Sequence, residues 1–247
     1  MSSTTKTRAF SGKVGTGFPS ENATSVKRPR AKASEAVEAE PPRDCPLCPR
    51  LVAFRHQWRA KEPDWFNAPV HSFGPLDARL LVVGLAPGLR GANRTGRPFT
   101  GDYAGDLLYA TLAEFGFSRG TFDARPDDGL GLIDARITNA VHCVPPENKP
   151  TPAEIHTCRD AYLTRRIPAM PKLRAIVALG RIAHESTLRA LGQRLAAAPF
   201  AHGARHTVGA LTLFDSYHCS RYNTNTGVLT PDMFRSVFAS VRAYLDA

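Results

Sequence analysis

Four of the five cysteines are spaced so that they could bind one soft metal centre. Cys45 and Cys48 form a C-x2-C pair, and Cys143 and Cys158 follow after a long gap, with fourteen residues between them. A C-x2-C turn directs both sulfurs to one side, and four thiolates suit either a 4Fe–4S cluster or a zinc ion. Spacing alone leaves both metals open, and the distant pair could instead be two small buried hydrophobic residues. Cys219 stands in another motif and is left out of the set.

A glycine-rich stretch at residues 84–102 combines an aromatic ring, a carboxylate and cations. Phe99 could stack on a planar ligand, Asp102 could serve as a base, and three arginines could contact phosphate. Glycines allow the backbone to approach a ligand closely and to offer N–H groups to it. The stretch matches neither common nucleotide-binding glycine pattern, so it does not indicate a nucleotide cofactor. The alternative is a long, flexible surface loop.

Two further polar side chains follow apolar runs of the sequence. Asn139 stands in Thr-Asn-Ala-Val at residues 138–141, and its amide offers one acceptor and two donors, which suits the edge of a base. Its alternative role is to satisfy the backbone at the end of a strand. His218 opens the polar segment His-Cys-Ser-Arg-Tyr-Asn-Thr-Asn-Thr-Gly at residues 218–227.

The elements that must position these side chains can be read from the hydrophobic pattern. Helical patterns separate short β-rich runs, which predicts an α/β domain with a parallel sheet covered on both faces. Thr230 and Pro231 have the types expected of an N-cap and a first helical residue. Ligands of such sheets bind beyond the carboxyl ends of the strands. The candidate residues Phe99, Asp102, Asn139 and His218 stand at or after the ends of predicted strands. The predicted strands are 79–84, 135–141, 173–180 and 211–217, and the predicted helices are 103–116, 152–170, 181–192 and 231–245.

Charge and composition indicate which classes of binding partner and which compartment to expect. The formal net charge is +10, and residues 1–44, with eight Lys/Arg and five Asp/Glu, hold +3 of it, which leaves +7 for the rest. This surplus suits a polyanion such as nucleic acid. No apolar run approaches the roughly 20 residues that span a bilayer, and the first residues lack the apolar core of a signal peptide. We therefore expect a cytoplasmic protein with no membrane partner and no disulfide framework. Residues 1–42 have no helical or strand period and are expected to form a disordered basic tail.

The motifs after the strands together resemble those of the uracil-DNA glycosylase superfamily, most closely its family 5, the B type. Residues 84–102 resemble the first motif of that family, residues 137–143 resemble its middle motif, and residues 218–227 resemble its histidine motif. The cysteine spacing is similar to that of the iron–sulfur families in this superfamily. The resemblance extends from about Cys45 to the C-terminus.

This resemblance implies a three-layer fold with a four-stranded parallel sheet, and a catalytic domain over residues 43–247. It implies that Phe99 stacks on an extruded base, that Asn139 binds the pyrimidine edge, and that His218 faces O2 and the glycosidic bond. The family's first motif also places Gly84, Ala86 and Pro87 at the base. The four cysteines, Cys45, Cys48, Cys143 and Cys158, would hold a 4Fe–4S cluster.

Two positions depart from the superfamily pattern. Sister families carry an acidic or amide side chain just after the opening glycine, where this chain has Leu85, as family 5 does. We therefore expect Asp102 to activate the water. Cys219 replaces a proline that is common in the superfamily, which puts the rigidity of that loop in doubt.

The expected activity is the hydrolytic removal of uracil from DNA in base-excision repair, extending to hypoxanthine or xanthine, by a monofunctional enzyme without a Schiff-base lysine. Arg90, Arg94, Arg97 and Arg221 are expected to contact phosphate, and Arg94, Arg97 and Arg221 are the candidate DNA-binding residues. We expect a monomer associated with the nucleoid. Two alternatives remain: a metal-stabilised module that senses damaged nucleic acid without catalysis, and a zinc-stabilised α/β enzyme acting on a small nucleotide.

Overall fold

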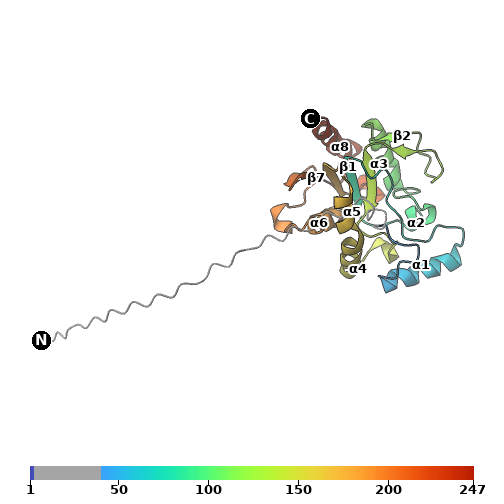
Figure 1. The fold of residues 1–247 in the computed structure, drawn as a ribbon, viewed down its shortest axis with the longest axis horizontal. Coiled ribbons are helices and arrows are strands. Elements are labelled where there is room, and N and C mark those ends of the chain that lie inside the picture. Colours follow the sequence, from blue (N-terminus) through green and yellow to red (C-terminus); the bar gives the residue numbers. More distant parts are fainter. Residues whose placement is uncertain (3–39) are drawn as a thin grey trace. The chain divides into compact units, whose positions relative to one another are not determined.

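Five strands form a mixed sheet in the order β4-β1-β5-β7-β6 (Figure 1). The computed structural model describes residues 1–2 and 40–247. Four strands run parallel, and β6 pairs antiparallel with β7 at one edge. The strands of this sheet are β1 (Leu80–Gly84), β4 (Ala135–Asn139), β5 (Ala175–Leu179), β6 (Arg205–Val208) and β7 (Leu211–Ser216). A separate short hairpin pairs β2 (Ser118–Arg119) with β3 (Gly131–Leu132).

The α/β class and the four predicted parallel strands are confirmed, while the fifth strand was not predicted. Strand β6 contains Arg205, His206 and Thr207, which do not form an apolar run, and only Val208 of it is buried. An edge strand with one solvated face lacks the continuous hydrophobic signal of a central strand. The sheet is therefore mostly, rather than wholly, parallel.

The helices cover both faces of the sheet because successive strand residues point to opposite sides. Leu80 and Val82 pack with the helices α3 and α8, whereas Leu81 and Val83 pack with α5 and α6. The helices are α1 (Pro49–Lys61), α2 (Ala92–Thr95), α3 (Tyr103–Glu114), α4 (Pro152–Cys158), α5 (Thr164–Ala169), α6 (Arg181–Ala190), α7 (Arg221–Asn225) and α8 (Pro231–Asp246). Short 3-10 turns are η3 (Pro146–Asn148) and η5 (Leu195–Ala197), and η4 (Arg159–Leu163) is a π-helical turn.

The long helix predicted over residues 152–170 is divided into α4, η4 and α5. It begins with a capping box, in which Thr151 accepts from the Glu154 backbone and the Glu154 carboxylate accepts from the Thr151 backbone. The π turn begins directly after Cys158, and Pro168 lies inside the last turn of α5. The N-cap predicted at Thr230 is present, and its hydroxyl accepts from the Met233 N–H.

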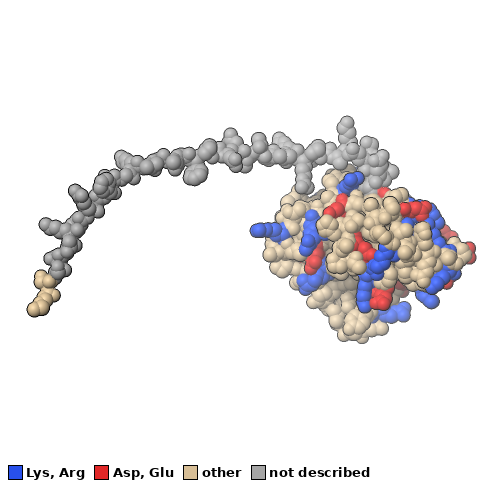
Figure 2. All heavy atoms as spheres, turned by 90° about the horizontal axis from the view of Figure 1, so that it is seen from below, with Lys and Arg blue, Asp and Glu red and all other residues tan. Residues whose placement is uncertain are grey.

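Most of the predicted tail, residues 1–42, lies outside the described residues. The described segment begins with Glu40, whose carboxylate pairs with Arg136 and Arg166. The buried cations lower the pKa of Glu40 to about 2, against the effect of burial itself. On the face drawn in Figure 2, basic side chains are distributed among acidic ones rather than gathered in one patch. No helix within residues 40–247 is long and apolar enough to cross a bilayer.

Candidate active site and four-cysteine pocket

A cavity of about 650 Å³ opens at the carboxyl edge of the sheet. It is lined by the four side chains on which the functional hypothesis depends, which are Phe99, Asp102, Asn139 and His218. Phe99 and Asp102 follow β1, Asn139 is the last residue of β4, and His218 follows β7. The parallel strands therefore bring together residues that are distant in sequence. Ala86 and Pro87 line the same cavity.

Phe99 is held in an unusual backbone conformation beneath this cavity. Its φ is +51°, in the left-handed region that bulky residues rarely adopt. Its ring lies 6.0 Å from the His218 ring at an interplanar angle of 26°. A side chain at Gly105 would collide with the Phe99 carbonyl oxygen, so this helix position requires glycine. Such strain persists where the surrounding structure fixes it, which is common in binding sites.

Asn139 lines the cavity and carries a buried acceptor without a partner in the described part of the chain. The residue is 3% exposed, and its Oδ1 has no hydrogen-bond partner among the described residues. A buried acceptor without a partner is costly, so a ligand donor is the natural complement. Gly84 pairs with Asn139 across β1 and β4, and a side chain there would collide with Oδ1 and lie 2.6 Å from the Phe99 ring. Gly84 therefore leaves space for the two groups.

Asp102 caps α3 and also faces the cavity. Its Oδ1 accepts from the Gly105 N–H at 3.3 Å, while side chains at Gly88 or Gly91 would press against Oδ2. Burial raises the pKa of Asp102, and the backbone hydrogen bonds only partly oppose that effect. The carboxylate is therefore desolvated and more basic than an exposed aspartate, as a water-activating group needs to be.

His218 is a neutral imidazole at neutral pH. Burial lowers its pKa to about 4. Its backbone carbonyl accepts from the Asn223 amide at 2.8 Å, and Ser220 caps α7, so the loop after β7 is fixed in the absence of a proline at Cys219. The Cys219 thiol instead donates to the Ala104 carbonyl at 3.5 Å.

The arginines expected to contact phosphate divide into two groups. Arg90 and Arg221 line the cavity and are exposed. Arg94 is also exposed, and its guanidinium lies next to Gly101, which lines the cavity. The expectation for Arg97 is wrong, because it is 5% exposed and forms two hydrogen bonds with the Asp128 carboxylate, of 2.7 and 2.6 Å. Its guanidinium also lies over three aromatic rings, those of Phe73, Tyr109 and Phe122. It supports the glycine-rich segment rather than binding DNA.

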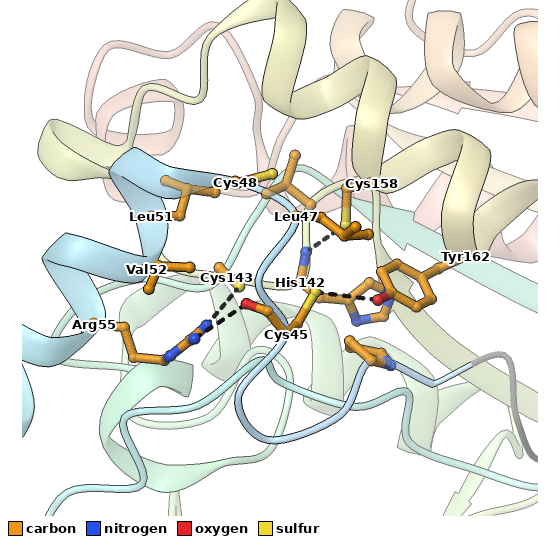
Figure 3. Close-up of a pocket in the computed structure, with 12 residues that line it drawn as sticks. Cys45, Leu47, Cys48, Leu51, Val52, Arg55, His142, Cys143, Cys158 and Tyr162 are labelled. Atoms are coloured by element: carbon orange, nitrogen blue, oxygen red, sulfur yellow. Dashed lines mark hydrogen bonds between the residues drawn. The ribbon is translucent and has the colours of Figure 1, made fainter.

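The four cysteines converge on a second, smaller pocket (Figure 3). Cys45 and Cys48 precede α1, Cys143 follows β4, and Cys158 ends α4. The sulfurs accept or exchange hydrogen bonds with three surrounding groups. Cys45 is 3.1 Å from the Tyr162 hydroxyl, the Arg55 guanidinium donates to Cys143 at 3.7 Å, and the His142 N–H donates to Cys158 at 3.3 Å.

Four thiols that line one pocket are a donor set that suits a soft metal centre, either an iron–sulfur cluster or a zinc ion. Burial raises the pKa of the Cys143 thiol to about 12 and that of Cys158 even further, so the thiolates need a cationic centre. Within the described chain, these sulfurs form no group of three that lie within 4.8 Å of one another.

A third polar cluster, which the sequence did not reveal, lies between α6, β6 and β7. The buried Asp215 carboxylate contacts His184 Nδ1 at 2.7 Å and His206 Nε2 at 3.2 Å. His184 Nε2 contacts the Ala198 carbonyl at 2.9 Å, so both ring nitrogens of His184 face oxygens. Burial opposes its charge, but Asp215 prevails and raises the pKa of His184.

Three further residues that line the cavity at the carboxyl edge of the sheet were not predicted from the sequence. They are Tyr103, Asn148 and Ser220. The signal for Asn148 was the run Pro-Pro-Glu-Asn-Lys-Pro at residues 145–150, since a dense turn segment directly after a sheet strand falls at the ligand edge. Tyr103 directly follows the first motif, which ends at Asp102, and Ser220 lies inside the histidine motif at residues 218–227.

An α/β sheet with an aromatic ring, a buried amide, a carboxylate and an imidazole around one cavity at its carboxyl edge is the arrangement expected of a base-excising enzyme. The model of the uracil DNA glycosylase superfamily matches residues 71–242. The chain belongs to this superfamily.

Curated relatives place it more finely. A Type-5 uracil-DNA glycosylase of Thermus thermophilus is 46% identical over 205 residues, covering 80% of this chain and 92% of the relative. A Type-5 uracil-DNA glycosylase of Pyrobaculum aerophilum is 39% identical over 208 residues, covering 83% and 89%. A Type-4 uracil-DNA glycosylase of Archaeoglobus fulgidus is 39% identical over 115 residues, covering 46% and 49%. The predicted resemblance to family 5 is confirmed.

Proposed function

We propose that this chain is a hydrolase of N-glycosyl bonds that removes uracil from DNA in base-excision repair. Family membership and the Type-5 relatives support this function. The observation that carries it is the unpaired Oδ1 of Asn139, buried beside the Phe99 ring. A uracil stacked on that ring can donate N3–H to Oδ1 and accept at O4 from the Asn139 amide group.

Recognition begins with extrusion of the nucleotide, because the glycosidic bond is hidden inside the duplex. Unstacking costs a few kcal/mol, and it costs least at a mismatch, so a G·U pair is a better substrate than A·U. Arg90, Arg94 and Arg221, which are exposed at or beside the cavity, offset part of this cost by contacting phosphates. Asn139 then selects the base inside the cavity.

Cleavage separates charge, and the site supports both fragments. Negative charge grows on the departing uracil, where the neutral imidazole of His218 or an N–H of its loop stabilises O2. Positive charge grows on the sugar, where the Asp102 carboxylate stabilises it and orients the attacking water. The raised pKa of the desolvated Asp102 strengthens it as a base.

The reaction ends at an abasic site. Among the described residues that line the cavity the basic side chains are arginine and histidine, and none is a lysine that could form a Schiff base. We therefore infer a monofunctional enzyme that leaves the strand intact. The cavity of about 650 Å³ has room for the second ring of hypoxanthine or xanthine, which supports a wider range of deaminated bases.

A 4Fe–4S cluster bound by Cys45, Cys48, Cys143 and Cys158 completes the proposal. The cluster would tie α1 and α4 to the segment after β4, and hydrolysis needs no electron transfer from it. The Arg55 guanidinium, Tyr162 hydroxyl and His142 N–H would hold the ligand sulfurs in place. Its role is structural.

The alternative of a damage sensor without catalysis loses its main support, because Asp102 lines the same cavity as Leu85 and supplies the polar group that Leu85 lacks.

The enzyme would work in the cytoplasm, at the nucleoid where the chromosome lies, and as a monomer.

The function is tested with a panel of oligonucleotides that each carry one deaminated base, followed by alkali and electrophoresis. We expect alkali-dependent cleavage at uracil, faster for G·U than for A·U, and slower cleavage at hypoxanthine and xanthine. Binding to every oligonucleotide without cleavage after alkali would instead support the sensor.

A further inference from the structure

The segment between Cys143 and Thr151 runs from the four-cysteine pocket to the base cavity. Cys143 lines the first pocket, and Asn148, five residues later, lines the second together with Asn139 and His218. Asn148 is exposed, and within the described chain its side-chain amide has no hydrogen-bond partner. This one segment therefore contributes both to the cysteine set and to the mouth of the cavity.

The backbone presents Asn148 in a specific conformation. Glu147 and Asn148 are consecutive non-glycine residues with φ of +55° and +57°. Asparagine tolerates this left-handed region better than most residues do. The backbone N–H of Asn148 donates to the Pro145 carbonyl at 3.2 Å, which closes the turn.

Arg50 ties this turn to the start of α1. It lies two residues after Cys48, and its Nη2 donates to the Lys149 carbonyl at 3.1 Å. The same guanidinium binds both carboxylate oxygens of Glu154, at 2.8 and 2.6 Å. Glu154 in turn accepts from the Thr151 N–H at 2.7 Å. The residue after Asn148 is thus fixed to the helix that follows the first cysteine pair.

The position of Asn148 indicates which part of a nucleotide it meets. Asn139 is buried and reads the base, whereas Asn148 is exposed and shares the cavity with the exposed Arg90 and Arg221. A nucleotide with its base at Asn139 leaves its sugar and phosphates at this mouth. The amide N–H groups of asparagine are suitable donors to phosphate oxygens.

We propose that Asn148 binds the sugar-phosphate backbone of the extruded nucleotide, and that Arg50 is a positioning residue that holds it there. This inference rests on the proposed glycosylase function. It assigns a substrate contact to the segment between the third and fourth cysteines, and it gives the cysteine-bound region a direct link to the cavity.

The test uses Asn148→Gly, which removes the amide and keeps the left-handed backbone. We expect KM for uracil-containing DNA to rise about tenfold and kcat to stay within about twofold. The lost contact is to a charged phosphate and is equally strong in the bound substrate and in the transition state. Asn148→Asp should raise KM further, because it places an anion beside phosphate. Gln193→Gly, which removes an exposed amide that does not line the cavity, is the matched control and should change neither quantity.

Arg50 is tested by a double-mutant cycle. Arg50→Met should raise KM about fivefold and retain the visible absorbance of the purified holoenzyme, and its effect should largely disappear in the Asn148→Gly background. Arg235→Met, which removes another half-exposed ion-paired arginine, is the control. If the Arg50 and Asn148 effects multiply, Arg50 does not act through Asn148.

Binding separates this inference from the proposed function. The dissociation constant for a duplex with one stable abasic-site analogue is measured by fluorescence anisotropy, with no chemistry involved. Wild type that releases no uracil contradicts the proposed function, whatever the binding result. An unchanged dissociation constant and KM for Asn148→Gly overturns the assignment of Asn148, even if uracil is released.

Discussion

At the scale of single residues, the site combines two half-buried, desolvated groups whose protonation is shifted in opposite directions. Burial raises the pKa of Asp102 and lowers that of His218 to about 4. Both shifts have the same cause, since a desolvated site disfavours the charged form of either group. At neutral pH the pair therefore consists of a carboxylate of increased basicity and an uncharged imidazole.

Asp102→Asn tests the carboxylate directly. We expect kcat for uracil release to fall about 10²- to 10⁴-fold, the range for a lost general base, with DNA affinity nearly unchanged. Asparagine is as good an N-cap as aspartate and carries no buried charge, so the melting temperature should hold or rise. Asp232→Asn, at an exposed first-turn position of α8 away from the cavity, serves as the control. Retention of full activity by Asp102→Asn would assign the water to another group.

The pH dependence follows from the same shifts. Because Asp102 must be ionised, kcat should fall as the pH drops through its folded-state pKa, which lies above the ordinary value of about 3.9. His218, with a pKa of about 4, stays neutral from pH 6 to 9 and should add no alkaline limb. Rates under enzyme excess between pH 4 and 9 check this. A loss of activity centred near pH 6.5 on the alkaline side would show that His218 acts as a cation.

At the scale of elements, the cysteine pocket joins α1, the segment after β4, and α4. Cys45→Ala should give protein with diminished near-visible absorbance, less iron and a lower melting temperature, because a bound cluster stabilises only the folded state. Cys219→Ala, at the buried cysteine outside the set, should keep the absorbance and the iron. A stable, fully active Cys45→Ala protein would refute the structural role of the cluster.

The buried contact between α6 and β7 supplies a second test of element packing. Asp215→Asn should destabilise the fold by about 3–5 kcal/mol, because it leaves the His184 imidazolium without its anion. The raised pKa of His184 means that this contact contributes fully below the unfolded value of about 6.5 and weakens as pH rises through the folded value. Denaturant unfolding at pH 6 and pH 9 should show a smaller effect of the substitution at pH 9.

Sequence predicted the elements that have strong local signals. The four parallel strands are almost continuously buried apolar runs, and the Thr230–Pro231 start of α8 follows local capping rules. Strand β6 and the π turn after Cys158 were not predicted, because β6 is polar and mostly solvated and a π turn depends on the packing around it. Such features are decided by tertiary contacts rather than by periodicity.

Arg97 shows the same limit within the site. An arginine in a glycine-rich loop is a reasonable phosphate ligand when only its neighbours in sequence are known. Its actual partner is Asp128, thirty-one residues away, and the aromatic rings around it come from three separate segments. By contrast, the convergence of Phe99, Asp102, Asn139 and His218 was predictable, because parallel strands must end at a common edge.

At the scale of the whole molecule, the positive charge favours association with DNA, and the two types of arginine should respond differently. Arg221→Gln should weaken DNA binding for every sequence and reduce the slope of log affinity against log salt by about one, without loss of stability. Arg97→Gln should instead lower the melting temperature, because it leaves the buried Asp128 carboxylate unpaired. Titrations at several salt concentrations and thermal unfolding of both variants distinguish these roles.

The central claim is that an extruded uracil lies on Phe99 and is held by Asn139 while its glycosidic bond is hydrolysed. The most direct test incubates excess enzyme with a G·U duplex and quantifies free uracil by mass spectrometry, for wild type and Asn139→Ala. Wild type should release one uracil for each duplex and leave the strand uncut before alkali, and Asn139→Ala should be slower by about 10²-fold or more. Equal rates for the two proteins, or no free uracil from wild type, would contradict the account.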